Sequence, residues 1–257
     1  MKEAILNELN RIENEHSVKI LYAVESGSRG WGFESTDSDY DVRFIYISKL
    51  NWYLSMKEKR DVIEVPIDEV LDVNGWDIQK ALMLYKRSNP TLLEWLSSPI
   101  VYMQDTSFAD NLRELMNDYF ISKSCIYHYL SMAKGNYREY LKKDYVKIKK
   151  YFYVIRPLMA CMWIEEHGSQ PPMLFEELMT SLEIPSDVID EIKNLLERKK
   201  ISSELKEEAR IPLLNQFIEE KIEYFEELAK SLEYIKNNDV SQLDDLFLNT
   251  LDEAWNN

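Results

Sequence analysis

The chain of 257 residues is 45% hydrophobic and 30% charged, a balance that is ordinary for a globular protein of one or two domains. Its 46 acidic and 31 basic residues give a net charge of −15, which disfavours non-specific coating of nucleic acid, because such coating depends on many contacts between cations and phosphates. The small numbers of glycine and proline exclude a collagen-like or low-complexity chain, and no apolar run approaches the length of about 20 residues that spans a bilayer.

The N-terminal segment predicts a helix and no export signal. Hydrophobic residues recur at helical spacing over residues 2–14, and charges interrupt the segment throughout. Because it lacks the apolar core of a signal peptide, we expect a cytoplasmic protein without a membrane partner. The two cysteines, Cys125 and Cys161, are expected to be small buried hydrophobes and not part of a disulfide framework or a zinc site.

The rest of the first hundred residues mixes strand and helix signals. Four segments have the composition of strands, namely 18–24, 41–47, 61–65 and 70–73. Pro66, Asp68 and Glu69 form the expected turn between the last two strands. Helical spacing of apolar residues returns over 76–87 and 91–96.

Strand signals vanish from about residue 106, and helical periodicity continues to the last residue. The evenly charged segment 190–210 predicts a solvated helix pair. We therefore predict an α+β fold, in which a small mixed-sheet domain over residues 1–105 is followed by an all-helical domain over residues 106–257.

A glycine-rich turn, GSRGWG, follows the first predicted strand and begins at Gly27 and Ser28. Such a turn exposes backbone N–H groups and a hydroxyl, which suits a phosphate. The plain alternative is a connector between two elements.

Two acidic residues, Asp39 and Asp41, open the next predicted strand. Residues two apart on a strand point to the same face, so these carboxylates would lie side by side. A cation between them would offset their repulsion, and oxygen-only ligands favour Mg²⁺ or Mn²⁺. The alternative is a surface turn with unrelated acids, but the apolar strand after Asp41 favours a position at the sheet.

Together these residues resemble the signature of the DNA polymerase beta-like nucleotidyltransferase superfamily. In that signature Gly-Ser is followed about a dozen residues later by an acid, an apolar residue, an acid and an apolar residue. Gly27-Ser28 and Asp39-Tyr40-Asp41-Val42 match it. The segments GWDIQKAL (75–82), NPTLLEWL (89–96) and YFYVIRPL (151–158) resemble, more specifically, the predicted nucleotidyltransferases associated with RNA-repair ligases, over nearly the whole chain.

The resemblance implies transfer of a nucleotidyl group from an NTP, with ATP favoured, to a hydroxyl acceptor, with release of pyrophosphate. It implies that Gly27 and Ser28 cradle the triphosphate. It also implies that Asp39, Asp41 and a third acid on a later strand hold Mg²⁺ or Mn²⁺, in the manner of two-metal phosphoryl transfer.

Three residues compete for the role of the third acid. We place it at Asp72, which is flanked by apolar residues on a predicted strand and precedes Lys80 by eight residues, as in related sequences. Glu64 has the same local pattern and stays open as an alternative. Asp77 also stays open, although it opens a predicted helix, where the helix dipole explains an acidic residue.

Several cations are candidates for contact with the nucleotide. Arg29, in the glycine turn, is expected to pair with a phosphate as a fork, and Arg43 is expected to balance the charge of the acids. Residues 134–150 carry a local net charge of +5.

Within and after this basic stretch, Lys142, Lys149, Tyr153 and Arg156 are spaced by seven, four and three, which predicts one helical face. We expect Lys149, Tyr153 and Arg156 to bind the nucleotide, with a solvated basic helix as the alternative.

The leading function is therefore a metal-dependent nucleotidyltransferase whose acceptor is an RNA end, a small molecule or a protein. The alternative is a nucleotide-binding regulatory or antitoxin-like protein on the same fold. A purely helical adaptor would leave the glycine turn and the paired acids unexplained.

Overall fold

A computed structural model describes residues 1–66, 70–201, 207–233 and 239–256, with the side chains of residues 200 and 201 outside the description. The chain divides into two compact units. Unit 1 contains residues 1–30, 39–119 and 237–257, and unit 2 contains residues 31–38 and 120–236. The turn expected at Asp68 and Glu69 lies outside the described residues, as does part of the charged segment 190–210.

Unit 1 is built on a five-stranded mixed sheet with the strand order β3-β4-β2-β1-β5. The strands are β1 (Lys19–Glu25), β2 (Tyr40–Ile47), β3 (Val62–Glu64), β4 (Leu71–Asp77) and β5 (Val101–Met103). Strands β2 and β4 are parallel, whereas β1 pairs with β2 and β5, and β3 with β4, in antiparallel fashion. The four predicted strands are thus present, and β5 is an additional one.

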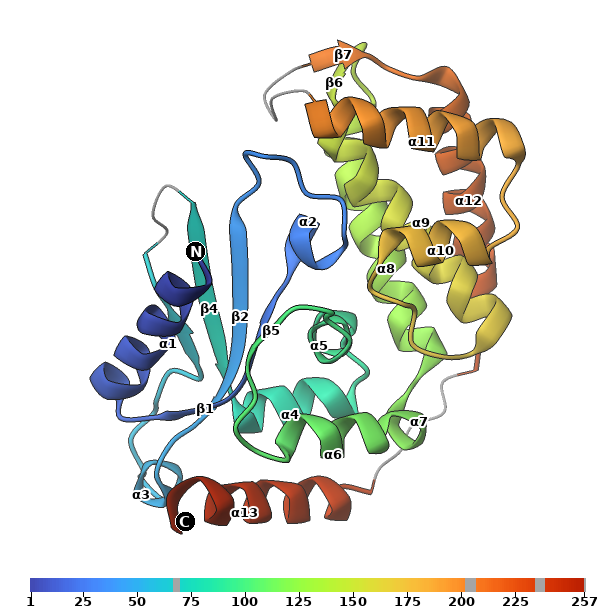
Figure 1. Ribbon diagram of the computed structural model, residues 1–257. Helices are drawn as coiled ribbons and strands as arrows, with labels where there is room; N and C mark the ends of the chain where they lie inside the picture. Colours follow the sequence, from blue (N-terminus) through green and yellow to red (C-terminus); the bar gives the residue numbers. More distant parts are fainter. Residues whose placement is uncertain (67–69, 202–206, 234–238, 257) are drawn as a thin grey trace. The chain divides into compact units, whose positions relative to one another are not determined.

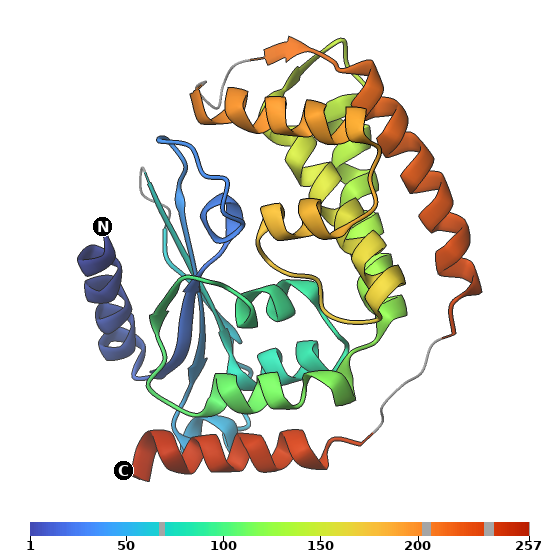
Figure 2. The same cartoon turned by 45° about the vertical axis from the view of Figure 1, so that its right-hand side comes forward.

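Helix α1 (Lys2–His16) covers one face of this sheet, and α4 (Ile78–Lys86), α5 (Pro90–Leu96) and α6 (Phe108–Glu114) lie on the other face (Figures 1 and 2). Ile5, Leu9 and Ile12 of α1 are fully buried and belong to one hydrophobic cluster with Val42 and Phe44 of β2. Because side chains alternate along a strand, the neighbouring odd-numbered residues of β2 point away from α1. That alternation decides which face carries the acidic residues.

The C-terminal helix α13 (Ser241–Asn256) belongs to unit 1. Glu253 accepts hydrogen bonds from the backbone and hydroxyl of Ser107, and Trp255 donates its indole N–H to the carbonyl of Ser48. Short helices α2 (Gly27–Gly30), α3 (Leu50–Tyr53) and α7 (Met116–Tyr119) complete the unit. The compact units therefore divide the chain differently from the boundary expected near residue 105, because α6, α7 and α13 pack with the sheet domain.

Unit 2 is mainly helical, with α8 (Ser122–Asn136), α9 (Ile148–His167), α10 (Phe175–Ser181), α11 (Ser186–Ile201) and α12 (Pro212–Ser231). Helices α8 and α9 lie side by side, as Figures 1 and 2 show in green and yellow. Cys125 and Cys161 are buried free thiols in this pair, and burial raises the pKa of both above the ordinary thiol value.

The segment after α8 in unit 2 contradicts the sequence reading. The segment after α8 forms a π-helix η1 (Tyr137–Leu141) and then β6 (Tyr145–Lys147), which pairs with β7 (Glu207–Ala209). The prediction of one continuous helical face from Lys142 to Arg156 is therefore wrong, because β6 separates Lys142 from α9. Helix α9 runs through Pro157, although proline ordinarily kinks or breaks a helix.

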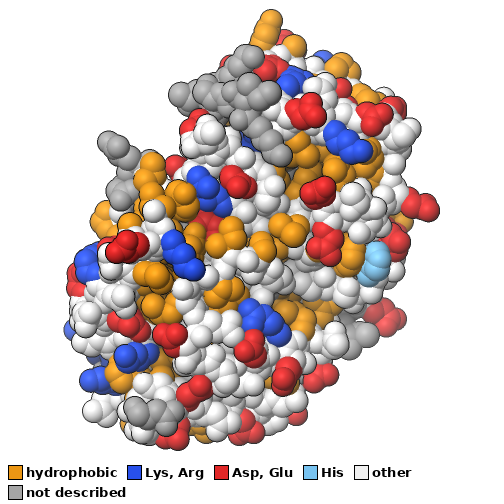
Figure 3. Space-filling model, in the orientation of Figure 1, with side chains coloured by type: hydrophobic (Ala, Val, Ile, Leu, Met, Phe, Trp, Pro, Cys, Tyr) orange, Lys and Arg blue, Asp and Glu red, His pale blue; other side chains and the backbone are white. Residues whose placement is uncertain are grey.

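No helix among the described residues combines the length and apolar composition needed to cross a bilayer. On the face drawn in Figure 3, acidic side chains are interspersed with basic and hydrophobic ones.

Candidate active site

The first four residues of the glycine-rich segment fold as α2, a single helical turn after β1, and the name glycine turn is kept below for these residues, 27–30. Residues 26–29 are half-buried, so the turn stays accessible. The amide of Ser26 donates to the carbonyl of Asp41 at 2.8 Å, which ties the turn to the start of β2. Gly27 has a φ of +57°, and a Cβ atom built there would lie 2.0 Å from the Oδ2 atom of Asp41. Only glycine therefore allows the Asp41 carboxylate to lie directly against the turn.

Asp41 and Asp72 come together because β2 and β4 are parallel and in register at these two residues. The guanidinium of Arg43 lies between them, with its Nη2 atom 3.0 Å from Oδ1 of Asp41 and 2.7 Å from Oδ2 of Asp72. About 30% of each carboxylate side chain is exposed, at 29% for Asp41 and 30% for Asp72. The charge-balancing role that the sequence suggested for Arg43 is confirmed.

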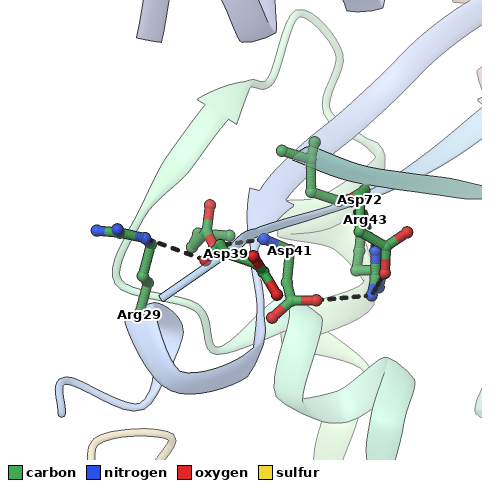
Figure 4. Close-up of polar contacts among 7 residues, drawn as sticks. Arg29, Asp39, Asp41, Arg43 and Asp72 are labelled. Carbon is green, nitrogen blue, oxygen red and sulfur yellow. Dashed lines mark hydrogen bonds and ion pairs between the residues drawn. The ribbon is translucent and has the colours of Figure 1, made fainter. Parts of the chain in front are cut away.

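Figure 4 shows both carboxylates turned toward the guanidinium of Arg43, while Arg29 extends on the other side of Asp39. The Nε atom of Arg29 donates to the backbone carbonyl of Asp39 at 3.1 Å, and its guanidinium stacks 3.8 Å from the ring centroid of Tyr40. Arg29 thus fastens the glycine turn to the residues before β2. Its proposed fork to a phosphate would compete with these contacts.

Glu25, the last residue of β1, is a site residue that the sequence reading missed. Its carboxylate is fully buried and accepts hydrogen bonds from the amide of Asp41, at 2.8 Å, and from the hydroxyl of Tyr102. Burial raises the pKa of Glu25, and the Asp41 carboxylate adds to that rise, whereas the two hydrogen bonds oppose it. The signal in the sequence was an acid that ends an apolar strand immediately before the glycine turn.

The other candidates for the third acid occupy different places. Asp77 stands at the far end of β4, five residues from Asp72, which is about 16 Å along a strand. It is buried, caps α4 by accepting from the amide of Gln79 at 2.8 Å, and accepts from the hydroxyl of Tyr53 at 2.8 Å. Burial raises the pKa of Asp77 to about 6. These contacts give Asp77 a structural role.

Glu64 lies nearer the acidic pair, on the edge strand β3. It is exposed and pairs with Arg60. Its partner in the sheet is Asn74, two residues from Asp72, so Glu64 and Asp72 share a face of the sheet. Together with Pro66 these residues line a hollow of about 510 Å³ beside the acidic pair. Of the three candidates, only Asp72 is bonded to the residue that also binds Asp41.

The three candidates in unit 2 have different surroundings. Lys149 is half-buried in the first turn of α9 and lines a hollow of about 390 Å³ with other lysines and tyrosines. Tyr153 packs edge-on against Trp31, with ring centroids 5.9 Å apart. Arg156 is 1% exposed, lies 4.6 Å from the ring centroid of Trp31, and donates to the carbonyl of Met173 at 3.3 Å. This packing gives Arg156 a place in the interior of unit 2.

The donor set of the site suits a cation. Asp41 and Asp72 already face one common positive group, and both supply only oxygen atoms, which hard divalent cations prefer. A metal ion there would take the place of the Arg43 guanidinium. Within the described ranges, no three His, Cys, Asp or Glu side chains are arranged to hold a metal, so Asp39 is not part of a formed triad.

The comparisons with known proteins decide the family. Residues 1–249 match the model of the RlaP family, which is described as an RNA repair pathway DNA polymerase beta family. The chain belongs to this family. It is 52% identical over 255 residues to the uncharacterized protein YcgL of Bacillus subtilis (strain 168), and the match covers 99% of this chain and 98% of that protein.

A crystal structure of a nucleotidyltransferase-like protein from Exiguobacterium sibiricum 255-15 is 14% identical, with coverage of 96% of this chain and 80% of that chain. Its TM-score is 0.33. Membership of the polymerase beta family supports nucleotidyl transfer as the general class of chemistry. The α+β class and the superfamily expected from the sequence are confirmed.

Proposed function

We propose that this protein transfers a nucleotidyl group from an NTP to a hydroxyl acceptor and releases pyrophosphate. The observation that carries the proposal is that Asp41 and Asp72 both bind the Arg43 guanidinium beside the glycine turn. Sheet register and turn conformation fix the backbone positions of these residues before a substrate arrives. Membership of the family agrees with this chemistry.

Each group of the site then has a role. Gly27 and Ser28 approach the triphosphate with backbone N–H groups, and Asp41 and Asp72 would hold Mg²⁺ or Mn²⁺, with Asp39 as a further ligand. When bound, the metal ion supplies positive charge that stabilises the phosphates during displacement. Asp72 accepts the proton of the acceptor hydroxyl. Arg43, whose Nη1 atom donates to the carbonyls of Val42 and Asp72, would turn its Nη2 atom from the carboxylates to a phosphate.

The test is a transfer assay with α-labelled NTPs, ATP first, with Mg²⁺ or Mn²⁺ present. The acceptors are a panel of tRNA, RNA ends, small hydroxyl compounds and total protein. We expect covalent label on one class of acceptor with wild-type protein and none with the Asp41→Asn variant. The Asp61→Asn variant is the matched control, because Asp61 is an exposed acid of unit 1 that pairs with Lys80 outside the site.

A second function is favoured by one observation. Arg43 satisfies both carboxylates without a metal ion, an arrangement that also suits a protein that binds nucleotide and performs no transfer. Such a regulatory or antitoxin-like protein would bind an NTP equally well with and without divalent cations. Nucleotide affinity measured in EDTA and in Mg²⁺ separates the two functions, since the transferase requires the cation to offset the charge of the triphosphate.

A further inference from the structure

A short segment joins the two halves of the candidate site and belongs to the other unit. Residues 31–38, here called the anchored loop, connect the glycine turn to Asp39. The residues on both sides of the anchored loop are part of unit 1, whereas the loop itself clusters with the helices of unit 2. The chain therefore leaves the site, enters unit 2 and returns to the site within eight residues.

The anchored loop is held in unit 2 by aromatic packing. Phe33 is 4% exposed, with its ring centroid 4.9 Å from that of Phe152 in α9 and 5.4 Å from that of Phe175 in α10. Trp31 packs 5.6 Å from Phe33 and beneath the guanidinium of Arg156. Aromatic side chains buried in this way are among the strongest apolar anchors in a protein.

Backbone hydrogen bonds hold the same segment. The ammonium of Lys199 in α11 is buried and donates to the carbonyl of Phe33 at 2.8 Å. The amide of Phe175 donates to the carbonyl of Trp31 at 3.0 Å. A buried lysine is rare unless its charge has a polar partner, so this contact specifies the position of the loop backbone.

The far end of the anchored loop is also ordered. The amide of Ser38 donates to the carbonyl of Ser35 at 3.1 Å, and the buried hydroxyls of the two serines are 2.9 Å apart. The hydrogen-bonded turn at residues 35–38 therefore ends directly before Asp39. We expect a displacement of Phe33 to affect the glycine turn on one side and Asp39 on the other, because only a few peptide units join Phe33 to each of them.

We propose that Phe33 and Lys199 are positioning residues for the candidate active site, through which unit 2 sets the conformation of the glycine turn and of the residues that precede β2. The inference rests on the proposed function for its consequence in nucleotide binding. Its structural part, the coupling of Lys199 to the glycine turn, stands without any nucleotide.

The experiment measures amide hydrogen exchange in the Lys199→Met variant without ligand. This substitution keeps the aliphatic stem and removes the donor to Phe33. The amide of Phe175 reports the anchor, and the hydrogen-bonded amides of Gly30 and Asp41 report the site. We expect all three to exchange about five times faster, the factor that corresponds to a hydrogen bond worth about 1 kcal/mol.

Matched variants separate positioning from general loss of stability. Lys193→Met, at an exposed lysine of the same helix, should leave all three amides unchanged. Lys199→Arg should restore slow exchange, because arginine keeps a donor for the carbonyl. Phe33→Leu, which removes the aromatic packing of the anchored loop, should also speed the exchange of the three amides. Faster exchange at Phe175 with unchanged exchange at Gly30 and Asp41 would overturn the proposal, as would unchanged exchange at all three.

Nucleotide affinity completes the test. We expect the Kd for Mg-ATP to rise about fivefold in Lys199→Met and to recover in Lys199→Arg, by the same hydrogen-bond contribution. Faster exchange with an unchanged Kd would overturn the role of Lys199 in positioning the nucleotide. If wild-type protein binds no NTP, the proposed function fails, and the exchange data still decide whether Lys199 controls the glycine turn.

Discussion

Replacing Gly27 with alanine should lower the free energy of unfolding much more than a glycine-to-alanine substitution at an unstrained and uncrowded position. Two features of the structure act together at this residue. Its φ of +57° lies in the left-handed region, and the new Cβ atom would meet the Oδ2 atom of Asp41 at 2.0 Å. These contacts predict a loss of folding stability in addition to any effect on nucleotide binding.

The magnitude follows from the two contributions. An L-residue in the left-handed region costs about 1 to 2 kcal/mol, and the forced displacement of a packed side chain costs about 1 to 3 kcal/mol more. Gly168 offers a matched control, because its φ is +61° and a Cβ atom there would meet nothing within 4 Å. Gly168→Ala should therefore show the backbone contribution alone, about 1 to 2 kcal/mol.

The assay is urea unfolding followed by circular dichroism, applied to the two alanine variants and to a double-mutant cycle of Gly27→Ala with Asp41→Ala. Removing the Asp41 carboxylate should relieve most of the overlap, so we expect a coupling free energy of at least about 1 kcal/mol. Equal losses for Gly27→Ala and Gly168→Ala, with no coupling to Asp41, would refute the close contact between the glycine turn and the acidic pair.

Three further outcomes are expected. Asp72→Asn should abolish transfer while nucleotide binding is largely kept. Full activity in Asp72→Asn, with loss of activity in Glu64→Gln, would show that Glu64 and not Asp72 is the third acid. Burial raises the pKa of Asp77 to about 6, so the folded protein favours the protonated carboxyl. The contribution of this preference to the free energy of unfolding is fully present below about pH 4 and is lost as the pH rises through 6. Thermal or urea unfolding between about pH 4 and pH 7 should therefore show wild-type protein losing up to about 3 kcal/mol relative to Asp77→Asn, and parallel curves would contradict this. Lys149→Glu should weaken NTP binding more at low salt than at moderate salt, unlike Lys193→Glu, and equal effects of the two would mean that the basic residues only face solvent.

The sequence predicted the parts of the site that depend on local pattern. Alternation along two strands is visible in residue order, so the face shared by Asp41 and Arg43 followed from spacing alone. The favoured third acid, Asp72, is the one that register brings beside Asp41. The register depends on the pairing of two distant strands and cannot be read from the sequence. Asp72 was therefore preferred to Glu64 and Asp77 only on its flanking residues.

Other features were not readable because they depend on contacts between distant segments. Glu25 looks like the end of an apolar strand, and only its hydrogen bonds to Asp41 and Tyr102 place it in the site. Arg156 has the spacing of a helical face, but the packing of Trp31 on its guanidinium decides that it is buried. The short strands β6 and β7 are stabilised by pairing with each other, which periodicity in either segment cannot show.

The most direct test of the account is the covalent transfer of an α-phosphate label from ATP in the presence of Mg²⁺, compared between wild-type protein and Asp41→Asn. The acidic pair at Asp41 and Asp72 predicts transfer to an acceptor by the wild-type protein and loss of at least about a hundredfold in the variant, as expected when a group that stabilises the transition state is removed. Transfer that Asp41→Asn leaves undiminished, or no transfer to any acceptor class by the wild-type protein, would contradict it.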